Sequence, residues 1–262
     1  MSPAENVETG GGPRLPPPFT AVLRDVVGST SDEAKALAAA GAAHGTLVWA
    51  MEQTAGRGRL DRQWQSPRGN LYTSCILRPA VTPSRAAELG FVAALAVTEA
   101  VRAVLPATVA VALKWPNDVL VDGGKVAGIL LEAQSTPGGA IDWLVLGIGI
   151  NVVAAPSGTP YPASALRPLG SSADVKSVLE RLYDALAVRL AEWQQGGFAV
   201  VRTRWLALAR GVGEPIEVRQ GAETVSGRFL DLDGDGALVL ETAMGPRRIT
   251  TGDVSFAPIM GA

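Results

Sequence analysis

Two glycines and two arginines alternate in the segment Gly56-Arg57-Gly58-Arg59. Glycine lets the main chain approach a ligand closely and present its N–H groups. Arginine adds a permanent positive charge and a planar set of donors that matches a phosphate or a carboxylate. The segment therefore predicts a loop that binds an anion, although surface turns rich in glycine and arginine also occur without a ligand.

Three further polar motifs lie at the margins of apolar runs. They are KWPND at residues 114–118, KVAGILLE at residues 125–132 and GIGIN at residues 147–151. Taken alone, Lys125 would be read as a solvated lysine that begins a strand. Its place among motifs that carry lysine, aspartate and asparagine favours a role in a ligand site.

Hydroxyl groups gather where a first strand, residues 19–27, gives way to an alanine-rich helix that ends near Gly41. Ser29, Thr30 and Ser31 stand at this junction. Serine and threonine at such a position are typical helix caps. A hydroxyl at the end of a strand is also well placed to meet a polar ligand, so the pattern allows both roles.

Strands and helices must position these groups. Period-two or short apolar patterns predict strands, and 3.6-residue periodicity predicts helices. The strands are residues 46–51, 71–77, 109–114, 119–121, 125–133 and 141–150, and the helices are residues 83–104, 173–195 and 198–209. Tight turns at residues 122–124 and 137–139 join the last strands into an antiparallel meander. We therefore expect an α+β fold with a mixed, largely antiparallel sheet and packed helices.

Both ends of the chain have a different pattern. Residues 1–18 are rich in glycine and proline and predict a flexible or extended lead-in. From Gly211 onward, short strands at residues 216–219, 225–232, 237–241 and 247–250 alternate with glycine-containing turns. The sequence thus predicts a lead-in at 1–18, a main domain at 19–210 and a small β-barrel domain at 211–262.

Composition excludes several function classes. With a formal charge of −2, the chain lacks the basic excess of a general nucleic-acid or membrane-surface binder. No apolar run approaches the length needed to span a bilayer, and we expect no membrane partner. Cys75 is the single cysteine, so an intramolecular disulfide cannot form. We expect a cytoplasmic protein that does not bind DNA.

The Gly-Arg segment extended to Trp64, together with the KWPND, KVAGILLE and GIGIN motifs in this order, resembles the signature set of the biotin protein ligases. The resemblance covers residue 19 to the C-terminal β domain. It implies the class II synthetase-like catalytic fold followed by an SH3-like β-barrel. Because residues 1–18 are too short for a helix-turn-helix domain, the chain is similar to the monofunctional ligases of this family.

The resemblance implies a reaction in two steps. Biotin and ATP, with Mg²⁺, would give biotinyl-5′-AMP and pyrophosphate. A specific lysine on a biotin carboxyl carrier domain of acetyl-CoA carboxylase or a related carboxylase would then take the biotinyl group and release AMP. The implied ligase acts as a monomer or homodimer and needs no covalent enzyme intermediate.

The resemblance also assigns roles to residues. The catalytic residues would be Lys125, Arg59 and Arg57. The biotin-binding residues would be Ser29, Thr30, Ser31, Gln53, Gly56, Arg57, Gly58, Arg59, Lys125 and Gly128. The nucleotide-binding residues would be Arg59, Trp64, Asn117, Asp118, Lys125 and Asn151, with Asp118 also a candidate Mg²⁺ ligand.

The chain departs from the family pattern at Asp61, where the family commonly has glycine, and we expect this carboxylate to alter loop closure or to pair with Arg59 or Arg62. Two other functions stay open. A lipoate or octanoate ligase or transferase shares the fold but would need an unbranched apolar tunnel. A non-catalytic biotin-binding module would keep the biotin contacts and lose the phosphate chemistry that Arg57, Arg59 and Lys125 suggest.

Overall fold

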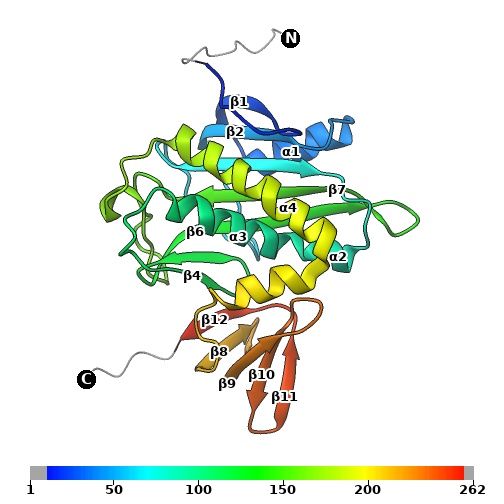
Figure 1. The fold of residues 1–262 in the computed structure, drawn as a ribbon, viewed down its shortest axis with the longest axis vertical. Helices are drawn as coiled ribbons and strands as arrows, with labels where there is room; N and C mark the ends of the chain where they lie inside the picture. Colours follow the sequence, from blue (N-terminus) through cyan, green and yellow to red (C-terminus); the bar gives the residue numbers. More distant parts are fainter. Residues whose placement is uncertain (1–10, 257–262) are drawn as a thin grey trace.

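The computed structural model describes residues 11–256, in which a seven-stranded sheet forms the centre of the larger domain (Figure 1). The strand order is β1-β2-β3-β7-β6-β5-β4, with β1 parallel to β2 and every other pair antiparallel. The strands are β1 (Thr20–Val27), β2 (Thr46–Gln53), β3 (Leu71–Leu77), β4 (Val111–Lys114), β5 (Asp118–Val121), β6 (Gly124–Ser135) and β7 (Ile141–Ile150). The predicted mixed, largely antiparallel sheet and its meander are confirmed.

The two faces of this sheet differ because side chains alternate along each strand. In β7, Leu144, Leu146 and Ile148 pack into the main core beneath α3 (Leu89–Arg102) and α4 (Val175–Leu206), the helices that cross the sheet in Figure 1. Val145 faces the opposite way and packs against α1 (Thr30–Ala39). Gly147 and Gly149 follow on that second face, where α1 leaves the sheet open.

The helices follow their apolar patterns with two differences from expectation. The single helix predicted at residues 83–104 is two, α2 (Pro83–Ala87) and α3, which meet at the buried Glu88. The two helices predicted at residues 173–195 and 198–209 run on as α4, interrupted at Gly197, whose φ of 66° is not helical. None of the helices within residues 11–256 is long and apolar enough to cross a membrane.

The C-terminal region forms a separate five-stranded antiparallel sheet, in the order β11-β10-β9-β8-β12. Its strands are β8 (Pro215–Gln220), β9 (Glu223–Leu232), β10 (Leu238–Thr242), β11 (Gly245–Ile249) and β12 (Asp253–Phe256). The predicted closed barrel is not confirmed, because the edge strands β11 and β12 do not pair with each other. The sequence pattern also missed β12, which is only four residues long.

Both ends of the described chain contact the larger domain. In the lead-in predicted at 1–18, residues 1–10 lie outside the described residues, whereas the Arg14 amide donates to Glu180 of α4. The turn between β9 and β10 of the C-terminal sheet accepts a hydrogen bond at its Gly236 carbonyl from Trp115 Nε1, in the turn between β4 and β5, at 3.1 Å. Trp115 is 2% exposed and belongs to the main core.

Candidate active site

A hollow of about 200 Å³ lies on the open face of the central sheet, over β3, β6 and β7. Glycines create this space, because their lack of a side chain leaves the sheet surface bare. Gly128 lies opposite Gly149, and Gly147 lies between Leu130 on one neighbouring strand and Ser74 on the other. A Cβ at Gly149 would lie 2.5 Å from Trp64 Nε1, and one at Gly147 would lie 2.8 Å from Ser31 Oγ.

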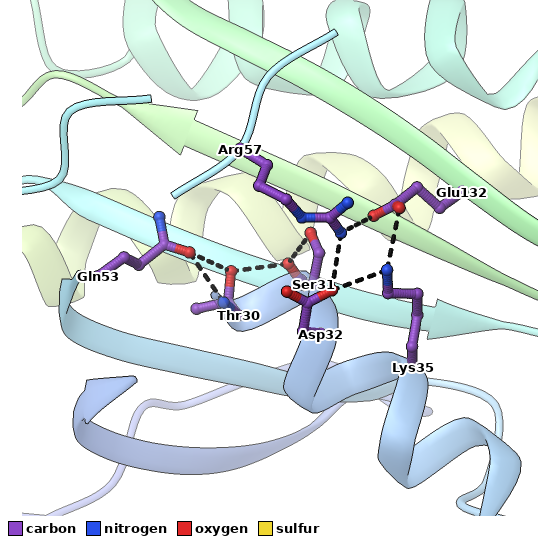
Figure 2. Close-up of polar contacts among 8 residues, drawn as sticks. Thr30, Ser31, Asp32, Lys35, Gln53, Arg57 and Glu132 are labelled. Atoms are coloured by element: carbon purple, nitrogen blue, oxygen red, sulfur yellow. Dashed lines mark hydrogen bonds and ion pairs between the residues drawn. The ribbon is translucent and has the colours of Figure 1, made fainter. Parts of the chain in front are cut away.

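One end of the hollow is lined by uncharged hydrogen-bonding groups (Figure 2). The Thr30 hydroxyl lies 3.0 Å from Gln53 Oε1 and 2.8 Å from Ser74 Oγ, and Ser31 Oγ lies 3.1 Å from Ser74 Oγ. The Gln53 amide nitrogen donates to Ser66 Oγ at 2.8 Å. This continuous network fixes the direction in which each group faces the pocket.

The hydroxyl side chains at the start of α1 belong to the pocket and not to a helix cap. Ser29 occupies the N-cap position of α1, but its side chain makes no capping hydrogen bond. Ser29, Thr30 and Ser31 are all buried and line the hollow. Ser74 is a site residue that the sequence pattern does not indicate, because its only signal is a hydroxyl on the same strand face as the apolar Ile76.

Trp64 forms a wall in the middle of the pocket. Its ring packs on Gly128 and Gly149, where added Cβ atoms would lie 3.1 Å and 2.5 Å from it. The Lys125 ammonium lies 5.3 Å from the ring centroid, within cation–π range. Trp64 Nε1 is buried without a hydrogen-bond partner and is free to donate to a ligand.

Two lysines and one aspartate form the charged centre of the pocket. Asp118 lies 2.5 Å from Lys125 Nζ and 3.8 Å from Lys114 Nζ. Lys114, which was not among the predicted site residues, lines the same pocket with its ammonium 4.4 Å from the Tyr161 ring centroid. Burial lowers the pKa of Lys114, an effect that the nearby Asp118 carboxylate partly offsets. The centre thus carries an excess of positive charge that suits an anion.

The two predicted nucleotide-binding asparagines differ in the contacts they make. Both polar groups of Asn117 are used, since its nitrogen donates to the Ile129 carbonyl at 2.6 Å and its oxygen accepts from Arg59 at 3.2 Å. Asn151 is 1% exposed and donates to the Ser164 carbonyl, but its Oδ1 has no partner. Asn151 thus offers a buried acceptor to a ligand N–H or O–H group.

Arg59 and Arg62 join the Gly-Arg loop, residues 56–64, to the C-terminal sheet. Arg59 donates to Thr251 Oγ1 at 3.1 Å and to the Gly252 carbonyl at 3.4 Å. Both terminal guanidinium nitrogens of Arg62, Nη1 and Nη2, donate to the Asp253 carboxylate. Burial opposes ionisation of Asp253, but the Arg62 hydrogen bonds and charge hold its pKa below the usual value. Asp253, which local sequence gave no reason to select, lines the pocket.

Asp61 makes neither of the pairings that we expected, because Arg59 and Arg62 are directed to the C-terminal sheet instead. Asp61 is exposed with a φ of 57°, and Leu60 before it has a φ of 55°. Glycine adopts such angles without steric cost, whereas other residues do so less readily. A glycine would therefore fit this position with less strain than Asp61 does.

Arg57 points toward Asp32 and Glu132 at the rim of the pocket (Figure 2). Its Nη2 lies 2.6 Å from Glu132 and 2.9 Å from Asp32. Gly56 and Gly58 complete the loop: a Cβ at Gly56 would lie 2.5 Å from Ser66 Oγ, and Gly58 N donates to the Arg62 carbonyl at 2.7 Å. All the predicted site residues except Gly56 line one pocket, with Arg57 already engaged by two carboxylates.

The metal-binding potential of the described residues is small. Within residues 11–256, no group of three or more His, Cys, Asp and Glu side chains is arranged to hold a metal ion. His44, the single histidine, lies outside the pocket and accepts a hydrogen bond from the Arg78 amide. A cation at Asp118 would have to displace Lys125.

Comparison with known proteins agrees with this geometry. Residues 24–151 match the Biotin/lipoate A/B protein ligase family, and residues 211–257 match the Biotin protein ligase C terminal domain. The chain is 40% identical to the biotin–[acetyl-CoA-carboxylase] ligase of Paracoccus denitrificans over 87% of this chain and 97% of that protein. It is 36% identical to the corresponding Mycobacterium tuberculosis ligase over 87% of this chain and 85% of that protein.

Solved structures give the same result. The biotin protein ligase from Aquifex aeolicus in complex with biotin and ATP superimposes with a TM-score of 0.77 and 29% identity, over 90% of this chain and 97% of that one. The sequence relatives, the shared fold and the pocket on the open sheet face together show that this chain belongs to the biotin protein ligase family.

Proposed function

We propose that the protein activates biotin with ATP as biotinyl-5′-AMP and transfers the biotinyl group to a lysine of a carboxylase carrier domain. The observation that carries this proposal is the division of one pocket into an uncharged polar end and a cationic centre. A substrate with a neutral polar head and a carboxylate tail matches such a pocket from end to end. The similarity to biotin–[acetyl-CoA-carboxylase] ligases supports the choice of substrate.

The polar end would hold the ureido ring of biotin. Thr30, Ser31, Ser74 and Gln53 offer hydroxyl and amide groups that can donate to its oxygen and accept from its N–H groups. A buried site of this kind discriminates strongly, because an analogue without polar groups would leave these partners unpaired. Octanoate or lipoate would do so, and we therefore favour biotin over the alternative acids.

The cationic centre would join the two reacting anions. The biotin carboxylate attacks the α-phosphorus of ATP, a P–O bond forms, and the bond to the β-phosphate breaks to release pyrophosphate. Lys125 and Arg59 supply fixed positive charge that offsets the repulsion between these groups and stabilises the transition state. Lys125 Nζ would exchange its contact with Asp118 for the incoming oxygens, and we propose it as the principal catalytic residue.

The opposite side of the centre would bind the nucleotide. Asn151 Oδ1 is a buried acceptor that can take a hydrogen bond from adenine or ribose. Trp64 presents an indole ring and an unpaired N–H, and Lys114 adds a second ammonium group near Asp118. Arg59 and Asn117 border the same region through their mutual hydrogen bond.

Mg²⁺ fits this proposal only as the companion of the ATP phosphates. Asp118 is a single carboxylate flanked by two ammonium groups, and such surroundings disfavour a resident divalent cation. Mg²⁺ commonly binds through substrate phosphates with few protein ligands. We therefore assign Asp118 to Lys125 and Lys114 and assign no step to the metal.

In the second step, the ε-amine of the carrier lysine attacks the acyl carbon of biotinyl-5′-AMP. An amide bond forms, AMP leaves, and the amine loses a proton to solvent or to Asp118 once Lys125 has moved to the phosphate.

The lone Cys75 is buried and free, in keeping with action in a reducing cytoplasm. The proposal applies equally to a monomer and a homodimer.

The test is incubation of the protein with ATP, Mg²⁺, labelled biotin and an apo carrier domain. We expect pyrophosphate release and label on the carrier, with labelled octanoate transferred at least about 100-fold more slowly. Lys125→Ala should lose at least about 100-fold in adenylate formation, because it removes a charge that acts in the transition state. Carrier labelling that is absent in the wild type, or equal in Lys125→Ala, would refute the proposal.

A further inference from the structure

Four charged side chains form a closed ring at the rim of the polar end of the pocket (Figure 2). In this quartet, Arg57 lies 2.6 Å from Glu132 and 2.9 Å from Asp32, and Lys35 lies 3.1 Å from Glu132 and 2.7 Å from Asp32. Each cation thus contacts both anions. The ring connects three separate parts of the chain, namely the Gly-Arg loop, helix α1 and strand β6.

The quartet is attached to the groups that line the polar end. Asp32 follows Thr30 and Ser31 in the first turn of α1, so its carboxylate moves with their hydroxyl groups. Glu132 lies on the same face of β6 as Leu130, which borders the pocket. The ring therefore fixes the position of the Gly-Arg loop relative to the hydroxyl groups of the polar end.

The charges of the quartet balance one another. Two cations and two anions give no net charge, so Arg57 adds little to the field that attracts an anionic substrate. Burial alone would lower the pKa of Lys35, but hydrogen bonds to Asp32 and Glu132 raise it, so this lysine stays protonated at neutral pH. To reach the reacting atoms, Arg57 would have to leave two carboxylates at once.

The Gly-Arg loop is a short hairpin that can be held from its two sides. Trp64 N donates to the Gly56 carbonyl at 2.9 Å, and Arg57 forms a β-bridge with Gln63. Arg57 leaves this hairpin toward α1 and β6, whereas Arg59 and Arg62 leave it toward the C-terminal sheet. The quartet is the attachment on the side of the polar end.

We propose that Asp32, Lys35 and Glu132 are positioning residues that act through Arg57 to hold the Gly-Arg loop over the pocket. This inference rests on the proposed function. In place of the catalytic role that the family resemblance implies, Arg57 anchors the loop and does not contact the reacting atoms. The quartet keeps the adenylate in the pocket until the carrier lysine arrives.

The proposal separates the rate of adenylate formation from the rate of adenylate loss. We would measure pyrophosphate release in a single turnover and the escape of labelled biotinyl-5′-AMP in a chase without carrier. Arg57→Ala, Glu132→Gln and Asp32→Asn should each speed escape, by about 10-fold for Arg57→Ala and by about 3-fold for the other two, since partly exposed ion pairs contribute modestly. Adenylate formation should change by less than about 3-fold in all of them.

A double variant tests whether Arg57 and Glu132 act as one unit. Arg57→Ala combined with Glu132→Gln should release the adenylate no faster than Arg57→Ala alone, because both changes remove the same contact. Salt at about 0.5 M should speed escape from the wild type and leave escape from Arg57→Ala nearly unchanged, since ions screen the quartet. Arg57→Lys should restore part of the retention.

The matched control is Glu223→Gln, which removes an ion pair to Arg247 on the C-terminal sheet and should behave as wild type. Thermal unfolding midpoints within about 3 °C of the wild type would show that each variant is folded. A loss of more than about 100-fold in adenylate formation by folded Arg57→Ala would overturn the inference, as would wild-type escape rates in Glu132→Gln and Asp32→Asn. A wild type that releases no pyrophosphate would instead refute the proposed function itself.

Discussion

The two ends of the pocket use different chemistry and different parts of the fold. The polar end is built from neutral groups within the larger domain: α1 supplies Thr30 and Ser31, β2 supplies Gln53 and β3 supplies Ser74. The other end, called the cationic end here, consists of the cationic centre and the nucleotide side next to it. It is built from charged groups, and the C-terminal sheet supplies one of them, Asp253. Neutral hydrogen bonds favour selection of a ligand, whereas fixed charges favour reaction between anions.

The two ends also differ in how much they depend on distant parts of the chain. The hydroxyl network at the polar end lies between elements that pack directly on one another. Arg59 and Arg62 at the cationic end are held by residues of a second sheet. Substitutions at the polar end should therefore affect biotin alone, and substitutions at the cationic end should affect ATP more than biotin, together with the contact between the two domains.

The largest effect should come from Gly149→Ala, because Trp64 separates the two ends and lies directly on this glycine. The new methyl group would lie 2.5 Å from Trp64 Nε1 and would push the ring into the pocket. We expect kcat/KM to fall about 100-fold for both biotin and ATP, with a loss of about 1–3 kcal/mol in unfolding free energy. Steady-state kinetics and denaturant unfolding would measure both effects.

The control for this change is Gly138→Ala, where the nearest atom to the new methyl group is 3.8 Å away. It should leave kinetics and stability unchanged. An effect of Gly149→Ala confined to one substrate would show that Trp64 belongs to one end of the pocket only.

Thr30→Val should break the polar end alone. The substitution keeps the shape of the side chain but removes a buried hydroxyl that lies within hydrogen-bonding distance of Gln53 and Ser74. We expect KM for biotin to rise about 10- to 50-fold and KM for ATP to change less than about 2-fold. Thr98→Val, which removes a buried threonine hydroxyl on α3, should lower stability without changing either KM. Equal changes in both KM values would contradict the division.

Lys114→Met should weaken the cationic end. Lys114 is 8% exposed, and burial lowers its pKa, which means that keeping its charge in the pocket destabilises the native fold. Methionine fills similar space without that cost, and we expect stability to hold while KM for ATP rises about 10-fold. Lys176→Met on α4, outside the pocket, serves as the control. A larger rise in KM for biotin than for ATP would contradict the assignment of Lys114 to the cationic end.

The smallest effect should come from Asp253→Asn, which loosens the contact between the loop and the C-terminal sheet. The pKa of Asp253 in the folded state is below its usual 3.8. Its carboxylate therefore stabilises the fold above pH 3.8 and loses this effect as the pH falls through the folded-state pKa. We expect wild type and variant to differ by under about 1 kcal/mol at pH 5–8, since solvent screens the pair.

Unfolding free energies measured from pH 3 to 8 would check this sign. The difference between the two proteins should be constant from pH 5 to 8 and should shrink as the pH falls below about 4. A difference that grows toward acid pH would mean that Asp253 does not act through its charge.

Local sequence predicted the strands and helices of the larger domain well, because periodicity records which side chains face the core. The resemblance to a known family, and not local pattern, selected Lys125, Trp64 and Asn151, which line one pocket in the structure. Local sequence missed Ser74 because a single hydroxyl within a buried strand resembles ordinary core sequence. It missed Asp253 because β12 is short and nothing near it in the chain indicates a pocket in another domain.

The motif set, the family and the alternation that leaves glycines bare on one sheet face all follow from the order of the residues. The partners of the charged side chains depend instead on how the chain folds. Arg57 and Arg59 are two residues apart with identical side chains, yet Arg57 pairs with a carboxylate 75 positions away and Arg59 with a carbonyl 193 positions away. Ion pairs depend on which distant segments the fold brings within a few ångströms, and sequence periodicity carries no record of that distance.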